Sequence, residues 1–262
     1  MTYFTRVLKK FPKVFWISNV IELFERWGWY GFYSGFFALY LTSAKEDGAL
    51  GFSNVEKGTI MGAGSMILYF LPVITGAIAD RVGYKKVLIL SFTTYILSFF
   101  MLSRFETFGA IFAAFILLAV AGALFKPIIS GTVARVTNKE TASLGFGIFY
   151  MMVNIGGFFG PFVASMLYKN SWDMVIYVSI AAMTINYLLV LFVYKEPAVA
   201  ETDKTFLQNI GIAFRNIGVT LTDWRYLMFL FIIGIFWTAY NQLYYSFPVF
   251  LDAWVNLDRL SL

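Results

Sequence analysis

The stretch from Val14 to Leu41, VFWISNVIELFERWGWYGFYSGFFALYL, is largely apolar but contains one charged cluster, Glu22-Leu-Phe-Glu25-Arg26. About 20 apolar residues in a helix cross the hydrocarbon core of a bilayer, so this stretch is long enough to span a membrane. Each ionisable side chain at that depth costs about 2.5–3.5 kcal/mol on insertion scales. Glu22 and Arg26 are i,i+4 neighbours on a helix, and Glu25 lies on a nearby face. Because such a cluster requires a water-filled or protein-lined interior, the stretch predicts a polar pathway through a membrane.

The composition of the whole chain is that of an integral membrane protein. Of its 262 residues, 60% are hydrophobic, 20% are aromatic and 13% are charged, whereas soluble domains are about 45–50% apolar and about 25% charged. Cys and His are both absent, which excludes disulfides, thiolate metal sites and His-based catalysis or proton relays. Nucleophile–base pairs and metal ligands are scarce. We therefore expect no enzymatic activity, no metal and no cofactor.

Apolar segments of membrane-spanning length predict seven transmembrane helices, at about 14–42, 55–79, 87–103, 107–134, 143–168, 173–194 and 224–251. Small residues such as Gly156 and Gly157 indicate close packing between helices. The predicted fold class is an all-α membrane protein with three parts. Residues 1–195 form a six-helix N-terminal bundle. Residues 196–223 form a cytoplasmic linker with an amphipathic helix at 205–221, and residues 224–262 hold the first helix of an incomplete second bundle.

The distribution of basic residues predicts the orientation of the chain. Of its 20 Lys and Arg residues, all but Arg26 and Lys126 lie in predicted loops, at the ends of predicted spans or near the ends of the chain. With an inside N-terminus, 13 of these fall on the inner side and five on the outer side. The positive-inside rule therefore predicts a cytoplasmic N-terminus. We also expect the chain to lie in the cell (inner) membrane. The net charge of +5 is explained by this loop bias, so we expect the lipid bilayer, and no nucleic acid, as a partner.

A charged loop follows the second predicted span, with the sequence Gly76-Ala-Ile-Ala-Asp80-Arg81-Val-Gly83-Tyr-Lys85-Lys86. An ordinary positive-inside loop accounts for Arg81, Lys85 and Lys86. It does not account for Asp80 and both glycines at this spacing. The loop resembles the G-x-x-x-D-R-x-G-R-K motif of the major facilitator superfamily, with Tyr84 in place of the usual Arg. This resemblance implies a cytoplasmic gating loop whose Asp pairs with a neighbouring helix.

Three further segments resemble motifs of the proton-dependent oligopeptide transporter family, which belongs to that superfamily. They cover the six-helix first half in the family's order. The first, Glu22-x-x-Glu25-Arg26-Trp-Gly-Trp-Tyr-Gly, is similar to E-x-x-E-R-F-x-Y-Y-G. The other two are Gly122-Ala-Leu-Phe-Lys126-Pro, similar to G-x-x-x-K-P, and Phe149-Tyr-Met-Met-Val-Asn154-Ile-Gly, similar to F-Y-x-x-I-N-x-G. The combination of E-x-x-E-R with K-P is the more specific part of this resemblance.

The resemblance implies roles for the matching residues. Glu22, Glu25, Arg26 and Lys126 would form a salt-bridge network that couples transport to protons. Two acids and two bases sum to zero charge, which is the total that a buried cluster requires. The substrate-binding residues that it implies are Tyr30, Tyr69, Lys126, Asn154, Trp237 and Asn241.

The seventh span departs from the family at one position. Phe236-Trp237-Thr-Ala-Tyr-Asn241-Gln is similar to F-W-x-x-x-E-Q, but Asn241 stands where the family has an acid. An amide neither takes up a proton nor offsets an ammonium, so this change bears on the solute more than on proton coupling.

Several of these residues also have purely structural interpretations. Tyr30, Tyr69 and Trp237 are compatible with aromatic packing, and Asn154 with an interhelical hydrogen bond. Lys126 as a snorkelling side chain is less compatible with its depth in the fourth span.

The function that we expect is proton-coupled import of a small peptide or related zwitterionic solute by alternating access. Its partners would be protons, the solute and a second transporter half that is missing from this chain. One alternative is a seven-helix receptor or sensor. A ligand-binding receptor of that kind requires an outside N-terminus, and a retinal protein requires a Lys that residues 224–251 lack. Another alternative is a major facilitator transporter for a non-peptide solute.

Overall fold

The structure is a computed structural model, and it describes residues 7–34, 36–168, 171–197 and 206–255. Within these ranges all regular elements are helical. The six-helix part contains α2 (Lys13–Tyr33), α3 (Phe36–Thr42), the short 3-10 helix η1 (Lys45–Asp47), α4 (Asn54–Phe70), α5 (Pro72–Val82), α6 (Tyr84–Leu102), α7 (Phe108–Arg135), α8 (Ala142–Leu167) and α9 (Trp172–Phe192). The remainder contains α10 (Phe206–Thr220), α11 (Trp224–Tyr245) and α12 (Phe247–Trp254).

Three of the predicted spans are each divided into two helices in the structure. The first divides at Ser34, whose ψ of 86° leaves the helical region. The second divides before Pro72, and α4 and α5 meet there at a bend of 47°. Proline favours the first turn of a helix because it has no amide hydrogen to donate. The seventh divides at Ser246, one residue before α12 begins.

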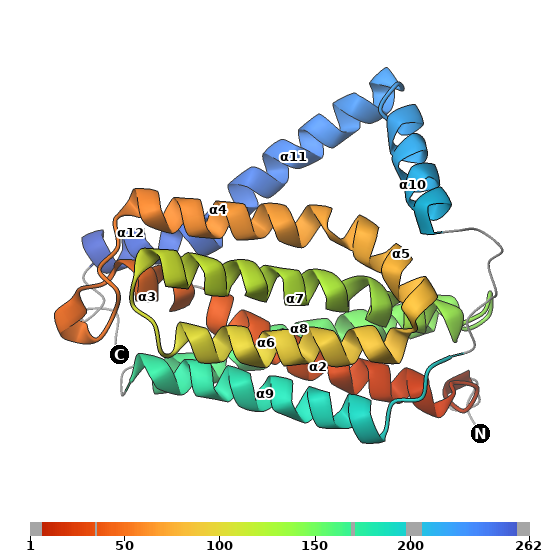
Figure 1. The fold of residues 1–262 in the computed structure, drawn as a ribbon, viewed down its shortest axis with the longest axis horizontal. Helices are drawn as coiled ribbons and strands as arrows, with labels where there is room; N and C mark the ends of the chain where they lie inside the picture. The colour runs from red at the N-terminus through yellow and green to blue at the C-terminus, as the bar shows by residue number, and fades with distance from the viewer. Residues whose placement is uncertain (1–6, 35, 169–170, 198–205, 256–262) are drawn as a thin grey trace.

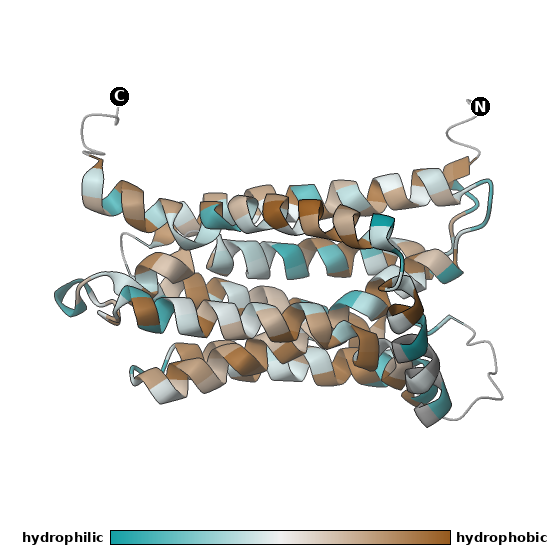
Figure 2. Cartoon of the chain, turned by 90° about the horizontal axis from the view of Figure 1, so that it is seen from above, coloured by the Kyte–Doolittle hydropathy of each residue, from teal (hydrophilic) through white to brown (hydrophobic). Residues whose placement is uncertain are grey.

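Five of the described helices are long and apolar enough to cross a membrane, or six if α4 and α5 together form one span. These correspond to six of the seven predicted spans. The remaining predicted span is the first. Its helix α2 is long enough to cross a membrane, but it contains the charged residues Glu22, Glu25 and Arg26. Figure 2 shows that hydrophobic residues predominate along the helices, and that the loops at their ends are largely hydrophilic. This pattern is the one that a bilayer imposes on a helical protein.

The charged helix α2 lies inside the bundle. It packs mainly against α8 and α9, while α6 packs against α7 and α9, and α4 packs against α7. Figure 1 shows these helices running side by side. Glycine makes the closest approach possible, because a Cβ atom on Gly156 of α8 would overlap the carbonyl oxygen of Leu23 on α2. A Cβ atom on Gly160 would overlap the carbonyl oxygen of Trp27 in the same way.

The pair α10 and α11 projects from the bundle and returns to it at α12 (Figure 1). A helix at 205–221 was expected, and α10 occupies most of that range; residues 198–205 of the predicted linker lie outside the described residues. No residue of α11 is buried, and large apolar side chains such as Phe231, Ile232 and Ile235 are exposed along it. An apolar helix of this kind requires lipid or further protein to cover its surface.

Candidate functional site

The two acids of α2 lie inside the bundle with no exposed side-chain surface. One carboxylate oxygen of Glu22 accepts a hydrogen bond from the ammonium of Lys126 on α7 at 2.8 Å. The same oxygen lies 3.4 Å from Nε of Arg26, one turn further along α2. The predicted contact between the first and fourth spans is therefore present in the structure.

Glu25 is held by two different donors. Its Oε2 accepts a hydrogen bond from Nε of Arg26 at 2.5 Å, and its Oε1 accepts one from the hydroxyl of Tyr95 on α6 at 2.6 Å. Hydrogen bonds from charged donors to carboxylates are among the strongest in proteins. Both oxygens of this carboxylate are therefore satisfied, and Tyr95 joins a third helix to the charged cluster.

Glu22 differs from Glu25 in one respect that matters for chemistry. Its Oε2 is buried and has no hydrogen-bond partner among the described residues. A buried carboxylate oxygen without a donor is costly, whereas a protonated oxygen at that position removes the charge. Protonation of Glu22 would also leave the charge of Lys126 unbalanced. In that state the ammonium of Lys126 would be free to bind another anion.

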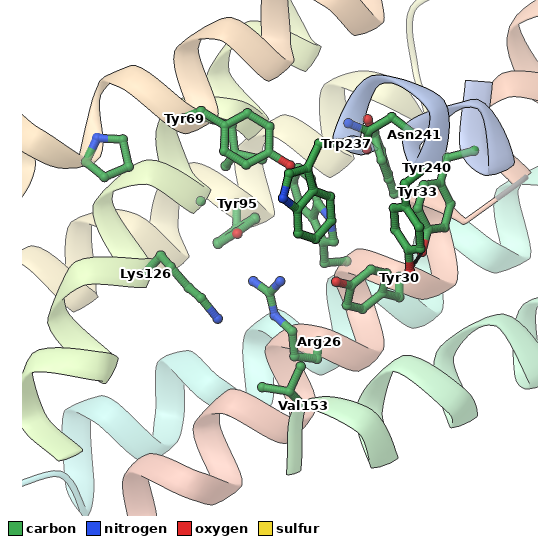
Figure 3. A pocket seen from close by; sticks show the side chains of 15 residues that line it. Arg26, Tyr30, Tyr33, Tyr69, Tyr95, Lys126, Val153, Trp237, Tyr240 and Asn241 are labelled. Carbon is green, nitrogen blue, oxygen red and sulfur yellow. Dashed lines mark hydrogen bonds between the residues drawn. The ribbon is translucent and has the colours of Figure 1, made fainter. Parts of the chain in front are cut away.

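The charged cluster borders a cavity of about 370 Å³ between α2, α4, α5, α6, α7, α8 and α11. Figure 3 shows Arg26 and Lys126 pointing into the same space. Tyr30 lies beneath the guanidinium of Arg26, with 5.5 Å between the guanidinium carbon and the ring centroid. The lining residues are Arg26, Trp29, Tyr30, Tyr33, Leu68, Tyr69, Pro72, Tyr95, Gly122, Lys126, Val153, Trp237, Tyr240, Asn241 and Tyr244.

Most of the substrate-binding residues that the motifs predicted are brought together here. Tyr30, Tyr69, Lys126, Trp237 and Asn241 all line the cavity. Asn154 is placed differently: its side chain is exposed and its amide donates to the carbonyl oxygen of Tyr150 in its own helix at 2.8 Å. The preceding residue, Val153, lines the cavity in its place.

Sequence reasoning missed several aromatic residues of the wall. These share a helix with a predicted residue or lie buried in an apolar span: Trp29, Tyr33, Tyr95, Tyr240 and Tyr244. Helical spacing offers a signal for two of them, because positions 237, 240, 241 and 244 fall on one face of a helix. Tyr95 had no such signal, since its relevance follows from the position of Glu25 on another helix.

The predicted gating loop joins α5 to α6 at one end of the bundle. Oδ1 of Asp80 accepts hydrogen bonds from Nη2 of Arg135 on α7 at 2.8 Å and from the hydroxyl of Tyr84 at 3.0 Å. The guanidinium of Arg135 also stacks over the ring of Tyr84 at 4.4 Å. Tyr84, the residue that departs from the superfamily motif, thus completes the contact between Asp80 and a neighbouring helix.

The other residues of the loop motif have separate roles. Gly83 has a φ of +101°, which favours glycine, and the carboxylate of Glu196 accepts a hydrogen bond from the next backbone amide, that of Tyr84. The ammonium of Lys85 donates to the carbonyl oxygen of Leu191 on α9 at 2.9 Å. The remaining members are Gly76, which faces Pro127 of α7, and Arg81 and Lys86, which are exposed.

A second set of contacts lies at the opposite end of the bundle, where α4 begins (Figure 1). The hydroxyl of Tyr245 on α11 lies 2.6 Å from Oγ of Ser65 and accepts a hydrogen bond from the hydroxyl of Tyr33 at 3.0 Å. The buried Lys57 donates to the carbonyl oxygen of Tyr245 at 3.0 Å. We refer to Tyr33, Lys57, Ser65 and Tyr245 as the α11 clamp, because they fix the end of α11 to α2 and α4.

Relatives with similar sequences are peptide permeases. The chain is 31% identical over 186 residues to dipeptide and tripeptide permease A of Yersinia pestis, covering 68% of this chain and 35% of that protein. It is 30% identical over 185 residues to dipeptide and tripeptide permease A of Escherichia coli (strain K12), again covering 68% of this chain and 35% of that protein. The chain therefore spans about a third of the length of these relatives.

Solved structures with a similar fold include transporters of the POT family. One, in complex with a thioalcohol-conjugated peptide, has a TM-score of 0.66 at 21% identity and covers 94% of this chain and 52% of its own. Another, in complex with 5-aminolevulinic acid, has a TM-score of 0.61 at 21% identity. The match covers 92% of this chain and 49% of that one. These likenesses confirm the predicted all-helical fold.

The family model described as Major Facilitator Superfamily matches residues 13–255, which include the charged helix, the gating loop and α11. The motif at the gating loop had predicted this superfamily, and the permease relatives agree with the motifs of α2, α7 and α8. The chain is an integral membrane protein and belongs to the Major Facilitator Superfamily.

Proposed function

We propose that this chain is part of a proton-coupled secondary transporter that imports small peptides or a related solute by alternating access. The observation that carries the proposal is the contact between Glu22 and Lys126 beside the cavity. It places a protonatable acid and a solute-accessible base in one hydrogen-bonded unit. Proton binding at one and anion binding at the other would then be linked through their shared hydrogen bond.

The domain organisation follows from the same proposal. Residues 1–195 would be the N-terminal bundle, 196–223 the cytoplasmic linker, and 224–262 the first helix of a second bundle. The exposed apolar surface of α11 supports this, since the other helices of a second bundle would cover it. The positive-inside count supports an N-terminus in the cytoplasm.

Alternating access assigns different roles to the two ends of the cavity. The α11 clamp would close the outer end, and the contact of Asp80 with Arg135 would stabilise the bundle at the cytoplasmic end. Transport would require the clamp to break while the charged cluster changes its protonation state.

The proposal is tested by reconstituting the transporter that contains this chain into liposomes with an imposed pH gradient, acidic outside. We expect uptake of radiolabelled dialanine that stops when a protonophore collapses the gradient. The matched control is Glu22→Gln, which is close in shape and cannot be charged. Wild-type uptake at the same rate with and without the pH gradient would contradict proton coupling. An absence of uptake for all di- and tripeptides would contradict the solute class.

A further inference from the structure

Four buried side-chain oxygens inside the bundle have no hydrogen-bond partner among the described residues. They are Oγ of Ser18, Oδ1 of Asn19, Oε2 of Glu22 and Oδ1 of Asn186, and we refer to them as the buried oxygen set. Ser18 and Asn19 lie on the turn of α2 that precedes Glu22. Asn186 of α9 joins them, because its amide nitrogen donates to the carbonyl oxygen of Ile21 at 3.0 Å. The four groups therefore gather along about one turn of α2.

The buried oxygen set consists almost entirely of acceptors. The amide nitrogen of Asn19 donates to the carbonyl oxygen of Phe15 at 2.9 Å, and that of Asn186 to the carbonyl oxygen of Ile21. Turning either amide around would place its oxygen against a carbonyl oxygen, so these contacts fix which atom is left without a donor. A carboxylate oxygen and two amide oxygens accept hydrogen bonds only, and the hydroxyl of Ser18 both accepts and donates. Such a set requires a donor from outside the described side chains.

A second bundle that packs against the cavity would not reach these atoms. The helices of this chain already bury all four residues, which are at most 2% exposed. Ser18, Asn19 and Asn186 are also absent from the described lining of the cavity. Oε1 of Glu22 binds Lys126 beside the cavity, whereas Oε2 belongs to the buried oxygen set. The two oxygens of one carboxylate thus meet two different environments.

Water fits this set better than a metal cation does. A buried water bonds about three polar groups that otherwise lack partners. It donates to a carboxylate and accepts from a carboxylic acid, so it satisfies Glu22 in both protonation states. Oxygen atoms also bind hard cations such as Na⁺, but Glu22 already contacts Arg26 and Lys126. A further cation would add positive charge to a buried cluster that is neutral without it.

We propose that the buried oxygen set binds water, and that this water carries the proton of Glu22 toward the start of α2. The inference rests on the proposed function, in whose orientation that direction is cytoplasmic, and it assigns a route to the transported proton. On release, the O–H bond of protonated Glu22 breaks and the proton joins the oxygen of the water. That water then passes one of its own protons to a second water or to the hydroxyl of Ser18, which releases its own proton in turn. The oxygens of Asn19 and Asn186 hold the water in place.

Two substitutions of Ser18 form a matched pair. Ser18→Thr and Ser18→Val have nearly the same shape, and only the first keeps a hydroxyl. The hydroxyl of Ser18 has no partner among the described residues, so a purely structural role predicts no loss of stability in Ser18→Val. We expect gradient-driven uptake of dialanine to fall about tenfold or more in Ser18→Val and to stay within about threefold of the wild type in Ser18→Thr. Exchange of labelled for unlabelled dialanine without a gradient should survive in both, because it requires no net release of a proton.

Deuterium oxide provides a readout that packing alone does not move. Uptake should slow in deuterium oxide by a larger factor in Ser18→Val than in Ser18→Thr, because proton release then limits the rate. Asn19→Leu is an independent variant, since its amide bonds only its own helix, and it should show the same loss of gradient-driven uptake with exchange retained. Ser98→Ala is the control and should keep wild-type uptake, because that buried hydroxyl donates to the carbonyl oxygen of Thr94 within α6.

The possible outcomes separate this inference from the proposed function. Wild-type rates of gradient-driven uptake in both Ser18→Val and Asn19→Leu would overturn the inference and leave the proposed function intact. Equal losses in Ser18→Val and Ser18→Thr would do the same, because bulk and not the hydroxyl would then be responsible. Wild-type uptake that a sodium gradient drives and a pH gradient does not would overturn both, as would an absence of gradient-driven uptake in the wild type.

Discussion

The ammonium of Lys126 lies 2.8 Å from the carboxylate of Glu22, although 104 residues separate them along the chain. This contact joins the first predicted span to the fourth. Both groups sit among apolar helices, where neither charge would be stable alone. A change in the charge of one group therefore alters the stability of the other charge. This coupling is the property that a proton-driven transporter requires.

Single substitutions in the charged cluster should abolish proton-driven uptake. Glu22→Gln, Glu25→Gln and Lys126→Ala each leave a net charge on a cluster that is neutral in the wild type. Proton-driven uptake should fall to background, while exchange of labelled for unlabelled solute without a gradient should survive better. Unaltered gradient-driven uptake in all three variants would contradict the scheme.

A double substitution separates charge balance from coupling. Breaking one partner of a buried pair costs about 3–5 kcal/mol, and less where one partner is partly exposed, as Lys126 is. Glu22→Gln combined with Lys126→Gln restores neutrality, so it should be more stable than either single variant in thermal unfolding while uptake stays at background. Restored proton-driven uptake in the double variant would show that neither group carries the proton.

Tyr95 is expected to support the cluster although no motif includes it. Its hydroxyl donates to Glu25 at 2.6 Å, so Tyr95→Phe leaves one buried carboxylate oxygen without a donor, at a cost of about 1–3 kcal/mol. We expect a lower melting temperature together with slower gradient-driven uptake. Tyr40→Phe is the control, because that hydroxyl donates to the carbonyl oxygen of Leu102 away from the cavity. Equal effects of both variants on uptake would argue against a role for Tyr95 at the site.

The contact between α2 and α8 depends on glycine. Gly156→Ala places a methyl group against the backbone of Leu23 and within 2.8 Å of Cβ of Arg26. Overpacking of this kind costs about 1–3 kcal/mol, and it should displace Arg26 and slow uptake. Gly147→Ala on the same helix has nothing within 4 Å, so it should leave stability unchanged or raise it by up to about 1 kcal/mol. Thermal unfolding and uptake of both variants, side by side, test the expectation.

The long helices were predictable because the bilayer sets their length. The spans expected at 107–134 and 143–168 correspond to Phe108–Arg135 and Ala142–Leu167, since hydropathy alone marks where an apolar segment begins and ends. The breaks at Ser34 and Ser246 were not predicted. They depend on local backbone geometry, and the apolar composition is the same on both sides of each break.

The charged part of the site was predictable and much of the aromatic wall was not. The motif resemblance implied that Glu22 pairs with Lys126, and the need to compensate charges inside a membrane supported that pairing. A tyrosine in an apolar span carries no such constraint, because hydropathy does not tell a cavity-facing ring from a lipid-facing one. The rotation of α8 illustrates this: it directs Val153 to the cavity and leaves Asn154 bonded to its own helix.

The α11 clamp predicts a conformational effect that can be measured without transport. Tyr245→Phe removes the hydrogen bonds to Tyr33 and Ser65 but keeps the ring and the carbonyl oxygen that Lys57 binds. Hydrogen bonds between membrane helices contribute about 0.6–1 kcal/mol each, so losing two should raise the population in which the α11 clamp is open about 7- to 30-fold.

These 262 residues contain no cysteine, so a reporter introduced among them would be the one thiol that they supply. Gly62→Cys is suitable, because Gly62 lines the cleft between α4, α11 and α12 and has nothing within 4 Å of an added Cβ atom. Its reaction with a membrane-impermeant maleimide applied from outside should accelerate in the Tyr245→Phe background by the same factor. Tyr226→Phe, near the other end of α11, is the control and should leave the rate unchanged. Equal labelling rates with and without the Tyr245 hydroxyl would mean that these hydrogen bonds do not hold the outer end closed.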